Sequence, residues 1–475
     1  MFTGYVLKIE ETVLVIKNTV YSPNRILENR VNKKIEGLTN IKNLLPTYVL
    51  SKIFNLQVVS NQSLSLIKCF FTTIVETRNF LELDYAFVAK ILASSALYIT
   101  SEVEVYRSGH AWLRHKIQDR KDYAKRLLLK VRLSLLTNDA LKYILNEPSS
   151  FTENGDCVAL ISGVLKNVEK LKEPQAGLSY NHRYCHHGSF SFIVCGGFKK
   201  NTNADDIFAK TVDVVSSSTL KHLKRLADLK RGRRNCNAVR IKDEVYVIGG
   251  EIIMGAFNER ILIRSVDRYS FKTKKWKKIT DVVDERYSYS ATAFMDKIFL
   301  LGGKIRGRPC NSCLEYDTKN CKWKICADMN EQRSSTASAV FEERIVVCGG
   351  KGIVSEPLNT VASFDVFANK WWLMPSMVYT KIHHDVVVVR NKLYVVNHGY
   401  NRSEVYDSIS KKFNCLKFDR YIGSGIKAVA IGCKIFIFHR YIKVVLCYDV
   451  NENEWSADYF YYDKTNYSCV KIPWF

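Results

Sequence analysis

The sequence predicts an α+β multidomain protein in which an all-α domain precedes an all-β, six-bladed propeller. Three observations predict this fold. An apolar, strand-like run that closes on a glycine pair recurs in the second half of the chain, with steps of 53, 53 and 47 residues. Aromatic residues seven positions apart recur in phase with these runs. In the first half, apolar residues recur at helical spacing instead.

Each glycine pair predicts the point where the second strand of a blade ends beside the central channel. A bulky apolar strand must turn sharply there, and glycine reaches backbone angles that other residues avoid. A repeat of about 50 residues with a strand ending in Gly-Gly is typical of a kelch-type propeller. The blade glycines are Gly196, Gly197, Gly249, Gly250, Gly302, Gly303, Gly349 and Gly350.

The aromatic pairs predict the third strand, a tight turn and the outer fourth strand of each blade. We expect their rings to fill the space between neighbouring blades. The pairs are Tyr269/Trp276, Tyr316/Trp323, Phe364/Trp371, Tyr406/Phe413 and Tyr448/Trp455. The last two pairs follow strands without a glycine pair, and blade one has Val215 and His222 at the aromatic positions. We therefore expect three well-formed and three degenerate blades, which an unrelated all-β domain would not show in phase.

Blade one lacks an inner strand, because the preceding segment runs straight into its second strand. Residues 466–472 (NYSCVKI) match the missing pattern at the far end of the chain. We expect them to complete blade one, so that the propeller spans 189–475 and leaves no open sheet edge.

Composition limits the class of protein. The 475 residues are 47% hydrophobic, which is typical of a folded chain of two or three domains. No apolar stretch is long enough to span a membrane, and charged residues near the N-terminus argue against a signal peptide. Scattered cysteines inside predicted strands suit reduced thiols, so we expect a cytoplasmic protein.

One cysteine cluster raises the alternative of a zinc site. Cys310, Cys313, Cys321 and Cys326 have the short spacing that zinc ligands need. The aromatic pair within this segment places the thiols on two strands of blade three, where successive side chains face opposite ways. We therefore expect neither a metal nor a cofactor. We also expect no enzymatic activity, although some kelch-like propellers are copper oxidases and fold alone does not decide function.

Residues 37–172 form the predicted helical domain and contain several short sequence motifs. These motifs are residues 79–83 (NFLEL), 93–99 (ASSALYI), Trp112, 127–135 (LLLKVRLSL) and 157–160 (CVAL). Their order and spacing resemble those of the BACK domain of BTB–BACK–kelch proteins. Within that family, the degenerate blades look most like those of poxvirus members. Residues 173–188 then read as a linker.

The first 36 residues look like the late part of a BTB domain, with Phe2-Thr-Gly4 at its last turn. In the family, the earlier part makes the dimer and most of the cullin-3 contact. We therefore expect residues 1–36 to be a remnant of a truncated BTB domain and the chain to be a monomer.

Basic residues recur in phase with the blades. Arg233, Arg286 and Arg333 each lie 16 residues before the first glycine of their blade, and Lys381 holds the same position before Asn397. Loops after the second strands add Lys304, Arg306 and Arg440. In kelch proteins that bind acidic peptides, arginines at such loops line the pocket, which the resemblance implies here. The alternative is that each arginine caps its strand or donates to a neighbouring carbonyl.

The net charge of +24 is compatible with nucleic acid, a membrane surface or an acidic protein as partner. The sequence contains no motif typical of nucleic-acid binding. We expect an acidic protein substrate, no nucleic acid and no membrane. The resemblance implies a substrate adaptor of a cullin-3 ubiquitin ligase. The alternative is a non-ligase protein that sequesters its partner or associates with the cytoskeleton, such as actin, in virus–host interaction.

Overall fold

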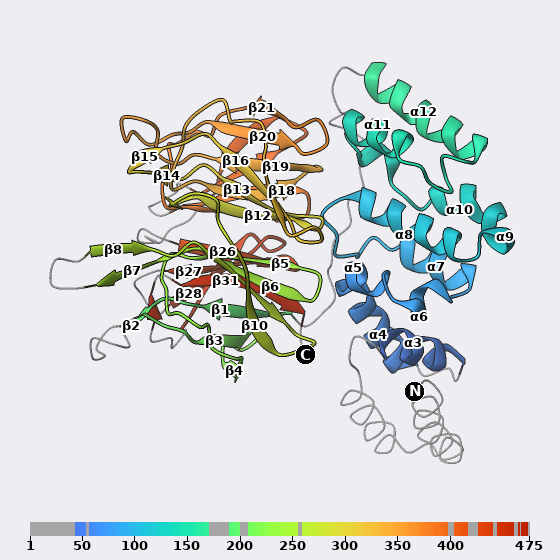
Figure 1. Cartoon of the computed structure of the whole chain (residues 1–475), viewed down its shortest axis with the longest axis horizontal. Helices are drawn as coiled ribbons and strands as arrows, with labels where there is room; N and C mark the ends of the chain where they lie inside the picture. The colour runs from blue at the N-terminus through green and yellow to red at the C-terminus, as the bar shows by residue number, and fades with distance from the viewer. Residues whose placement is uncertain are drawn as a thin grey trace, which may run out of the picture.

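The described residues fold into a helical domain and a propeller (Figure 1), whose large sheets are six four-stranded antiparallel sheets. The computed structural model describes residues 43–53, 57–170, 190–199, 208–254, 259–397, 403–416, 426–439, 444–459, 464–465 and 467–473. The expected BTB remnant, the expected linker and Arg440 lie outside these residues. Within this described part, no helix is long and apolar enough to cross a membrane.

The helical domain packs around one apolar core. Its α-helices are α3 (Leu44–Ile53), α4 (Gln57–Cys69), α5 (Phe71–Ile74), α6 (Arg78–Leu81), α7 (Tyr85–Leu92), α8 (Glu102–His115), α9 (Ile117–Arg120), α10 (Ala124–Leu128), α11 (Asn138–Asn146) and α12 (Gly155–Lys170). Two short 3-10 helices are η1 (Lys121–Tyr123) and η2 (Leu133–Leu135). Trp112 of α8 is buried at the centre, where its indole donates to the Leu83 carbonyl at 2.8 Å. The guanidinium of Arg120 lies 3.9 Å from the Trp112 ring centroid, in a cation–π contact.

Each large sheet is one propeller blade, as the glycine and aromatic patterns predict. In order from the inner strand, blade one is β31 (Ser468–Pro473), β1 (Phe190–Cys195), β3 (Val212–Ser216) and β4 (His222–Arg225). Blade two is β5 (Asn237–Ile241), β6 (Glu244–Ile248), β9 (Ser265–Ser270) and β10 (Lys275–Asp281). Blade three is β12 (Ser290–Phe294), β13 (Lys297–Leu301), β16 (Cys313–Asp317) and β17 (Lys322–Ile325).

The other three blades repeat the arrangement. Blade four is β18 (Ala337–Phe341), β19 (Arg344–Cys348), β20 (Val361–Asp365) and β21 (Lys370–Met374). Blade five is β22 (Asp385–Val389), β23 (Lys392–Val396), β24 (Glu404–Asp407) and β25 (Lys412–Cys415). Blade six is β26 (Ile426–Ile431), β27 (Lys434–His439), β28 (Val444–Asp449) and β29 (Glu454–Tyr459).

The aromatic pairs join strands within a blade and also reach the preceding blade. Tyr316 and Trp323 are register partners on β16 and β17, with ring centroids 5.0 Å apart. The Trp323 indole donates to the carbonyl of Asp281, the last residue of blade two's outer strand, at 2.9 Å. Trp371 of blade four donates in the same way to Ala327 after blade three, at 2.8 Å. These two tryptophans therefore support two blades at once, because the ring packs in one blade and its N–H donates to the other.

The inner strands form a closed ring. β31 pairs antiparallel with β1, from Phe190 opposite Pro473 to Cys195 opposite Ser468. It also contacts β26 and β5, the inner strands of blades six and two. The far end of the chain thus supplies the inner strand of the first blade, which removes a sheet edge that would otherwise be open.

The propeller has two faces that differ in what lies on them. The turn face carries the short turns between first and second strands, such as the turn between β12 and β13, and lies against the helical domain. The glycine face carries the glycine pairs at the opposite ends of the second strands. Two hairpins project from it on the side away from the helices (Figure 1): β7 (Glu251–Met254) with β8 (Glu259–Leu262), and β14 (Lys304–Ile305) with β15 (Arg308–Pro309). Smaller pairings on this face join β2 (Phe198–Lys199) to β30 (Lys464–Thr465), and β11 (Arg286–Tyr287) to β14.

Candidate functional site

The glycine pairs bring neighbouring blades into direct backbone contact on the glycine face. Gly302 and Gly303 have φ angles of 62° and 104°, which side chains rarely allow. A Cβ on Gly302 would lie 2.3 Å from the carbonyl oxygen of Arg333 in the next blade. The N–H of Gly303 donates to that same carbonyl at 2.9 Å. Glycine is therefore required here both for the turn and for the close approach of the next blade.

The phased basic residues (Arg233, Arg286, Arg333 and Lys381) sit at these contacts. Each arginine donates from Nη1 to the carbonyl of the first glycine of its own blade, at 3.2 Å for Arg233 and Arg286 and 3.1 Å for Arg333. The backbone carbonyls of Arg233, Arg333 and Lys381 accept from the glycine pair of the preceding blade, at 2.7 to 2.9 Å. Arg233 and Arg333, which make both contacts, thus each join two successive blades.

Each phased basic residue also has an acidic neighbour. Arg233 pairs with Asp267 at 2.6 Å, Arg286 with Asp284 at 2.6 Å and Arg333 with Glu331 at 2.8 Å. All three arginine side chains are 1% exposed. Lys381 and Glu404 pair at 2.5 Å with both side chains fully buried. Burial lowers the pKa of Arg333 and of Lys381, since a charged group is less stable away from water.

This geometry is that of the alternative in which the arginines donate to neighbouring carbonyls. Their guanidinium groups point into the blades and already have an acceptor and a counter-ion. Direct binding of a partner's carboxylate by Arg233, Arg286, Arg333 and Lys381 stays a prediction. The acidic residue two positions before Arg286 and Arg333 is the sequence signal that favours the structural role.

Lys304 and Arg306, also predicted as partner-binding residues, lie on the hairpin that projects from the glycine face. Arg306 and Gly307 form its two-residue turn, with φ angles of 50° and 81°. Positive φ at both central residues is the conformation that best matches the twist of a tight hairpin. Arg306 and Arg308 are exposed, and Lys304 is half-buried. Among the predicted site residues that the structure describes, those on this hairpin are therefore the ones whose charge faces solvent.

An apolar loop tip lies on the same face and was not predicted from the sequence. It follows the glycine pair of blade four, and its residues Ile353 and Val354 are 68% and 83% exposed. The base of the loop is fixed, since Lys351 forms bridges with Ser334 and Pro357. An isolated exposed apolar residue needs no explanation, but two at the tip of an anchored loop give a surface suited to a partner.

The turn face is joined to the helical domain by charged and aromatic contacts. Lys242, in the turn between β5 and β6, lies 2.7 Å from Glu76 and 2.9 Å from Asp296. The Arg240 guanidinium lies 5.0 Å from the ring centroid of Tyr98 and 5.4 Å from that of Phe70, in the cation–π range. Met295 and Phe367 of the propeller pack directly against the helical core.

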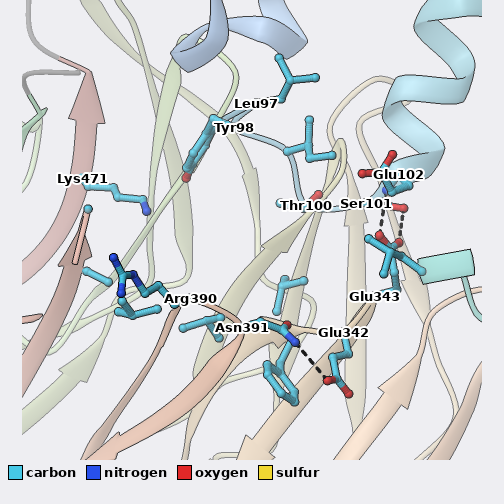
Figure 2. A pocket seen from close by; sticks show the side chains of 18 residues that line it. Leu97, Tyr98, Thr100, Ser101, Glu102, Glu342, Glu343, Arg390, Asn391 and Lys471 are labelled. Carbon is cyan, nitrogen blue, oxygen red and sulfur yellow. Dashed lines mark hydrogen bonds between the residues drawn. The ribbon is translucent and has the colours of Figure 1, made fainter. Parts of the chain in front are cut away.

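A cavity of about 250 Å³ lies within this junction (Figure 2). Tyr98, Ser101 and Glu102 line it from the helical domain, and turns of blades four and five line it from the propeller. Glu343 of blade four contacts Ser101 and Glu102 across it. Sequence reasoning missed this junction, because a polar turn such as residues 342–343 looks like any solvent-exposed hairpin turn.

Two family models match the chain. The model described as BACK: BTB And C-terminal Kelch matches residues 44–146, and the model described as KLHDC2/KLHL20/DRC7 Kelch-repeats domain matches residues 181–399. The first covers most of the helical domain, and the second reaches from before blade one into blade five.

Relatives give the same result. Kelch-like protein 38 of Rattus norvegicus is 24% identical, over 71% of this chain and 57% of its own length. Kelch-like protein 7 of Rattus norvegicus is 28% identical, over 82% and 66%. Kelch repeat and BTB domain-containing protein 3 of Homo sapiens is 21% identical, over 58% and 45%. The chain thus matches about half to two thirds of the length of these relatives. Together with the helical domain and the six-bladed propeller, these matches show that residues 44–146 are similar to a BACK domain and residues 181–399 to kelch repeats, and that the chain resembles kelch-like proteins.

Proposed function

We propose that the chain is a non-enzymatic adaptor that holds a protein partner on the glycine face and links it, through the helical domain, to a cullin-3 ubiquitin ligase. The observation that supports this best is the division of the propeller between its two faces. The turn face lies against the helical domain, and the glycine face presents a basic hairpin and an apolar loop tip to solvent. Such a molecule can hold two proteins at once.

The partner's binding segment is acidic and carries an apolar residue. Arg306 and Arg308 supply exposed guanidinium groups, which match carboxylates with two hydrogen bonds each. Ile353 and Val354 supply the apolar contact. The net charge of +24 attracts an acidic partner over a longer range, so the association rate falls as salt is added.

The test of partner binding uses charge reversal. The Arg306→Glu and Arg308→Glu double variant is compared with Lys275→Glu and Lys277→Glu, two exposed lysines on the outer strand β10. Both variants change the net charge equally. Acidic peptides are selected on the wild type from a displayed library and are titrated by calorimetry into the wild type and both variants. We expect the hairpin variant to lose at least about tenfold in affinity and the β10 variant to keep it; equal loss in both would mean non-specific attraction.

The test of the ligase role is binding of purified cullin-3 to the full chain. Co-elution of the two proteins on a sizing column supports the adaptor. Partner binding without cullin-3 binding would favour the alternative, a protein that sequesters its partner outside a ligase.

We also propose that the chain is a monomer, because a net charge of +24 opposes close approach of two copies. Light scattering in low and high salt measures this mass directly. A dimer that persists in both conditions would contradict the proposal.

A further inference from the structure

The N-terminus of α8 points at the propeller and binds it through two turns. Ser101 is the N-cap of this 14-residue helix, and Glu104 completes a capping box from within the helix. From the propeller, the N–H of Met295 donates to Thr100 Oγ1 at 2.6 Å. The side chain of Glu343 reaches the same two-residue segment from blade four. Residues 100–101 are therefore held from both domains.

Glu343 supplies a second cap to α8 from the other domain. Its Oε1 accepts from the Glu102 N–H at 2.8 Å, and its Oε2 lies 2.5 Å from Ser101 Oγ (Figure 2). Ser101 Oγ itself accepts from the Val103 N–H. The first N–H groups of a helix have no partner within it, so an acceptor placed there stabilises the helix. A helix N-terminus favours a carboxylate, but at this site burial and the charges of Glu102 and Glu104 outweigh that effect and favour the protonated form of Glu343.

The turn that carries Glu343 has an unusual backbone. Glu342 and Glu343 have φ angles of 47° and 60°, in the left-handed region that favours glycine or asparagine. Two glutamates in a two-residue hairpin turn cost local stability. The interdomain contact of Glu343 offsets that cost, while Glu342 is within 3.4 Å of Asn391 on the next blade.

Several acidic groups gather at this junction. Glu102 and Glu104 of α8 lie near Glu343, Glu342 precedes it in the turn, and Asp296 between β12 and β13 lies near Glu104. Lys242 and Lys319 already pair with Asp296, at 2.9 and 2.6 Å. Arg390 and Lys471 line the opposite side of the cavity from Glu343 (Figure 2). Burial, together with the charges of Glu102 and Glu104, raises the pKa of Glu343 to about 8, and burial raises the pKa of Glu104 to about 7.

We propose that Glu343 is an interdomain cap that fixes the helical domain to the turn face, and that this docking tightens when the carboxyl cluster binds a proton. The proposal is independent of any partner or ligase. A carboxyl group whose pKa is raised in the docked state binds more protons when docked than when free, where its pKa is near 4.5. Docking is therefore strongest at mildly acidic pH and weakens as the pH rises toward 8.

The experiment measures hydrogen exchange at the amides of Glu102 and Val103 in the full chain, expressed as protection factors so that base catalysis of exchange cancels. Glu343→Ala removes the cap, and we expect protection at these amides to fall roughly 2- to 30-fold at every pH, the range for loss of an N-cap. In the wild type, protection falls about tenfold or more between pH 6 and pH 8.5. Glu343→Gln keeps the acceptor without the charge, so it keeps protection and loses most of this pH dependence.

Two controls separate this role from general destabilisation. Glu285→Gln changes an exposed carboxyl group on the glycine face, so we expect the protection of the Glu102 amide to stay unchanged. Amides of β19, inside blade four, report whether the Glu343 variants still fold, and they keep wild-type protection. Unchanged Glu102 protection in Glu343→Ala would overturn the cap, and wild-type pH dependence in Glu343→Gln would overturn the role of its proton.

Discussion

At the scale of the residue, one arginine in this propeller connects two blades. Arg333 donates to the Gly349 carbonyl of its own blade, while its backbone carbonyl accepts from Gly303 of the blade before. The spacing of 16 residues predicted where this side chain enters the blade but not the direction in which it points. That direction depends on the Gly349 carbonyl, 16 residues away, which only the folded chain brings to the guanidinium, whereas Glu331 is already a neighbour in the sequence.

Replacing Arg333 by alanine should therefore affect stability. The change leaves the Gly349 carbonyl and the Thr360 hydroxyl without a buried donor, so we expect the free energy of unfolding to fall by about 2–4 kcal/mol. Arg306→Ala, on the exposed hairpin, should change it by less than about 0.5 kcal/mol. Urea denaturation measures both. An Arg333→Ala protein of unchanged stability that no longer binds an acidic partner would instead support direct binding.

At the scale of the element, the glycine and aromatic patterns predicted the blades well because they report local sterics. A strand that must turn sharply against its neighbour needs glycine wherever it occurs, so four glycine pairs located four second strands. The degenerate blades five and six still form the same four-stranded sheets, because their apolar alternation and aromatic pairs remain. The hairpins of the glycine face were not predicted, since their short strands carry no such alternation.

A glycine of the blade pattern and a glycine of a helix should respond oppositely to alanine. Gly302→Ala places a Cβ 2.3 Å from the Arg333 carbonyl at a positive φ, so we expect a loss of at least about 2 kcal/mol in unfolding free energy. Gly163, exposed within α12, has no atom within 4 Å of its Cβ position. Gly163→Ala should stabilise the protein by about 0.5–1 kcal/mol. Thermal denaturation compares the pair, and similar effects at both sites would contradict the steric argument.

Deleting residues 466–475 should abolish cooperative unfolding of the propeller. The deletion removes β31, which pairs along the whole length of β1 and contacts the inner strands of two other blades. Calorimetry should show a broad transition or none. A synthetic peptide of residues 464–475, added to the truncated protein, should restore a sharp transition by adding the missing strand. An unchanged melting curve after deletion would show that β31 is dispensable.

At the scale of the whole molecule, the sequence predicted the order of the two folds but not how they meet. The junction depends on the turn tips of separate blades, which come together only once the ring has closed. Glu343 and Lys242 are 101 residues apart in the numbering, yet both reach the helical domain. Their residue types are ordinary for hairpin turns, so no local pattern separates them from solvent-exposed residues. The contact is a property of the assembled ring.

This arrangement predicts that the two proposed partners bind independently. The glycine face and the helical domain lie at opposite ends of the blades, so a partner on one does not cover the other (Figure 1). We expect the affinity of cullin-3 for the chain to change by less than about 0.5 kcal/mol when an acidic peptide saturates the glycine face. Titration calorimetry with and without the peptide measures this coupling. Arg306→Glu should lower only the affinity for the peptide. Glu343→Ala, which loosens the junction between the domains, should leave the affinities for the peptide and for cullin-3 unchanged. Strong coupling in the wild type, lost in Glu343→Ala, would mean that the interdomain cap transmits binding from one face to the other.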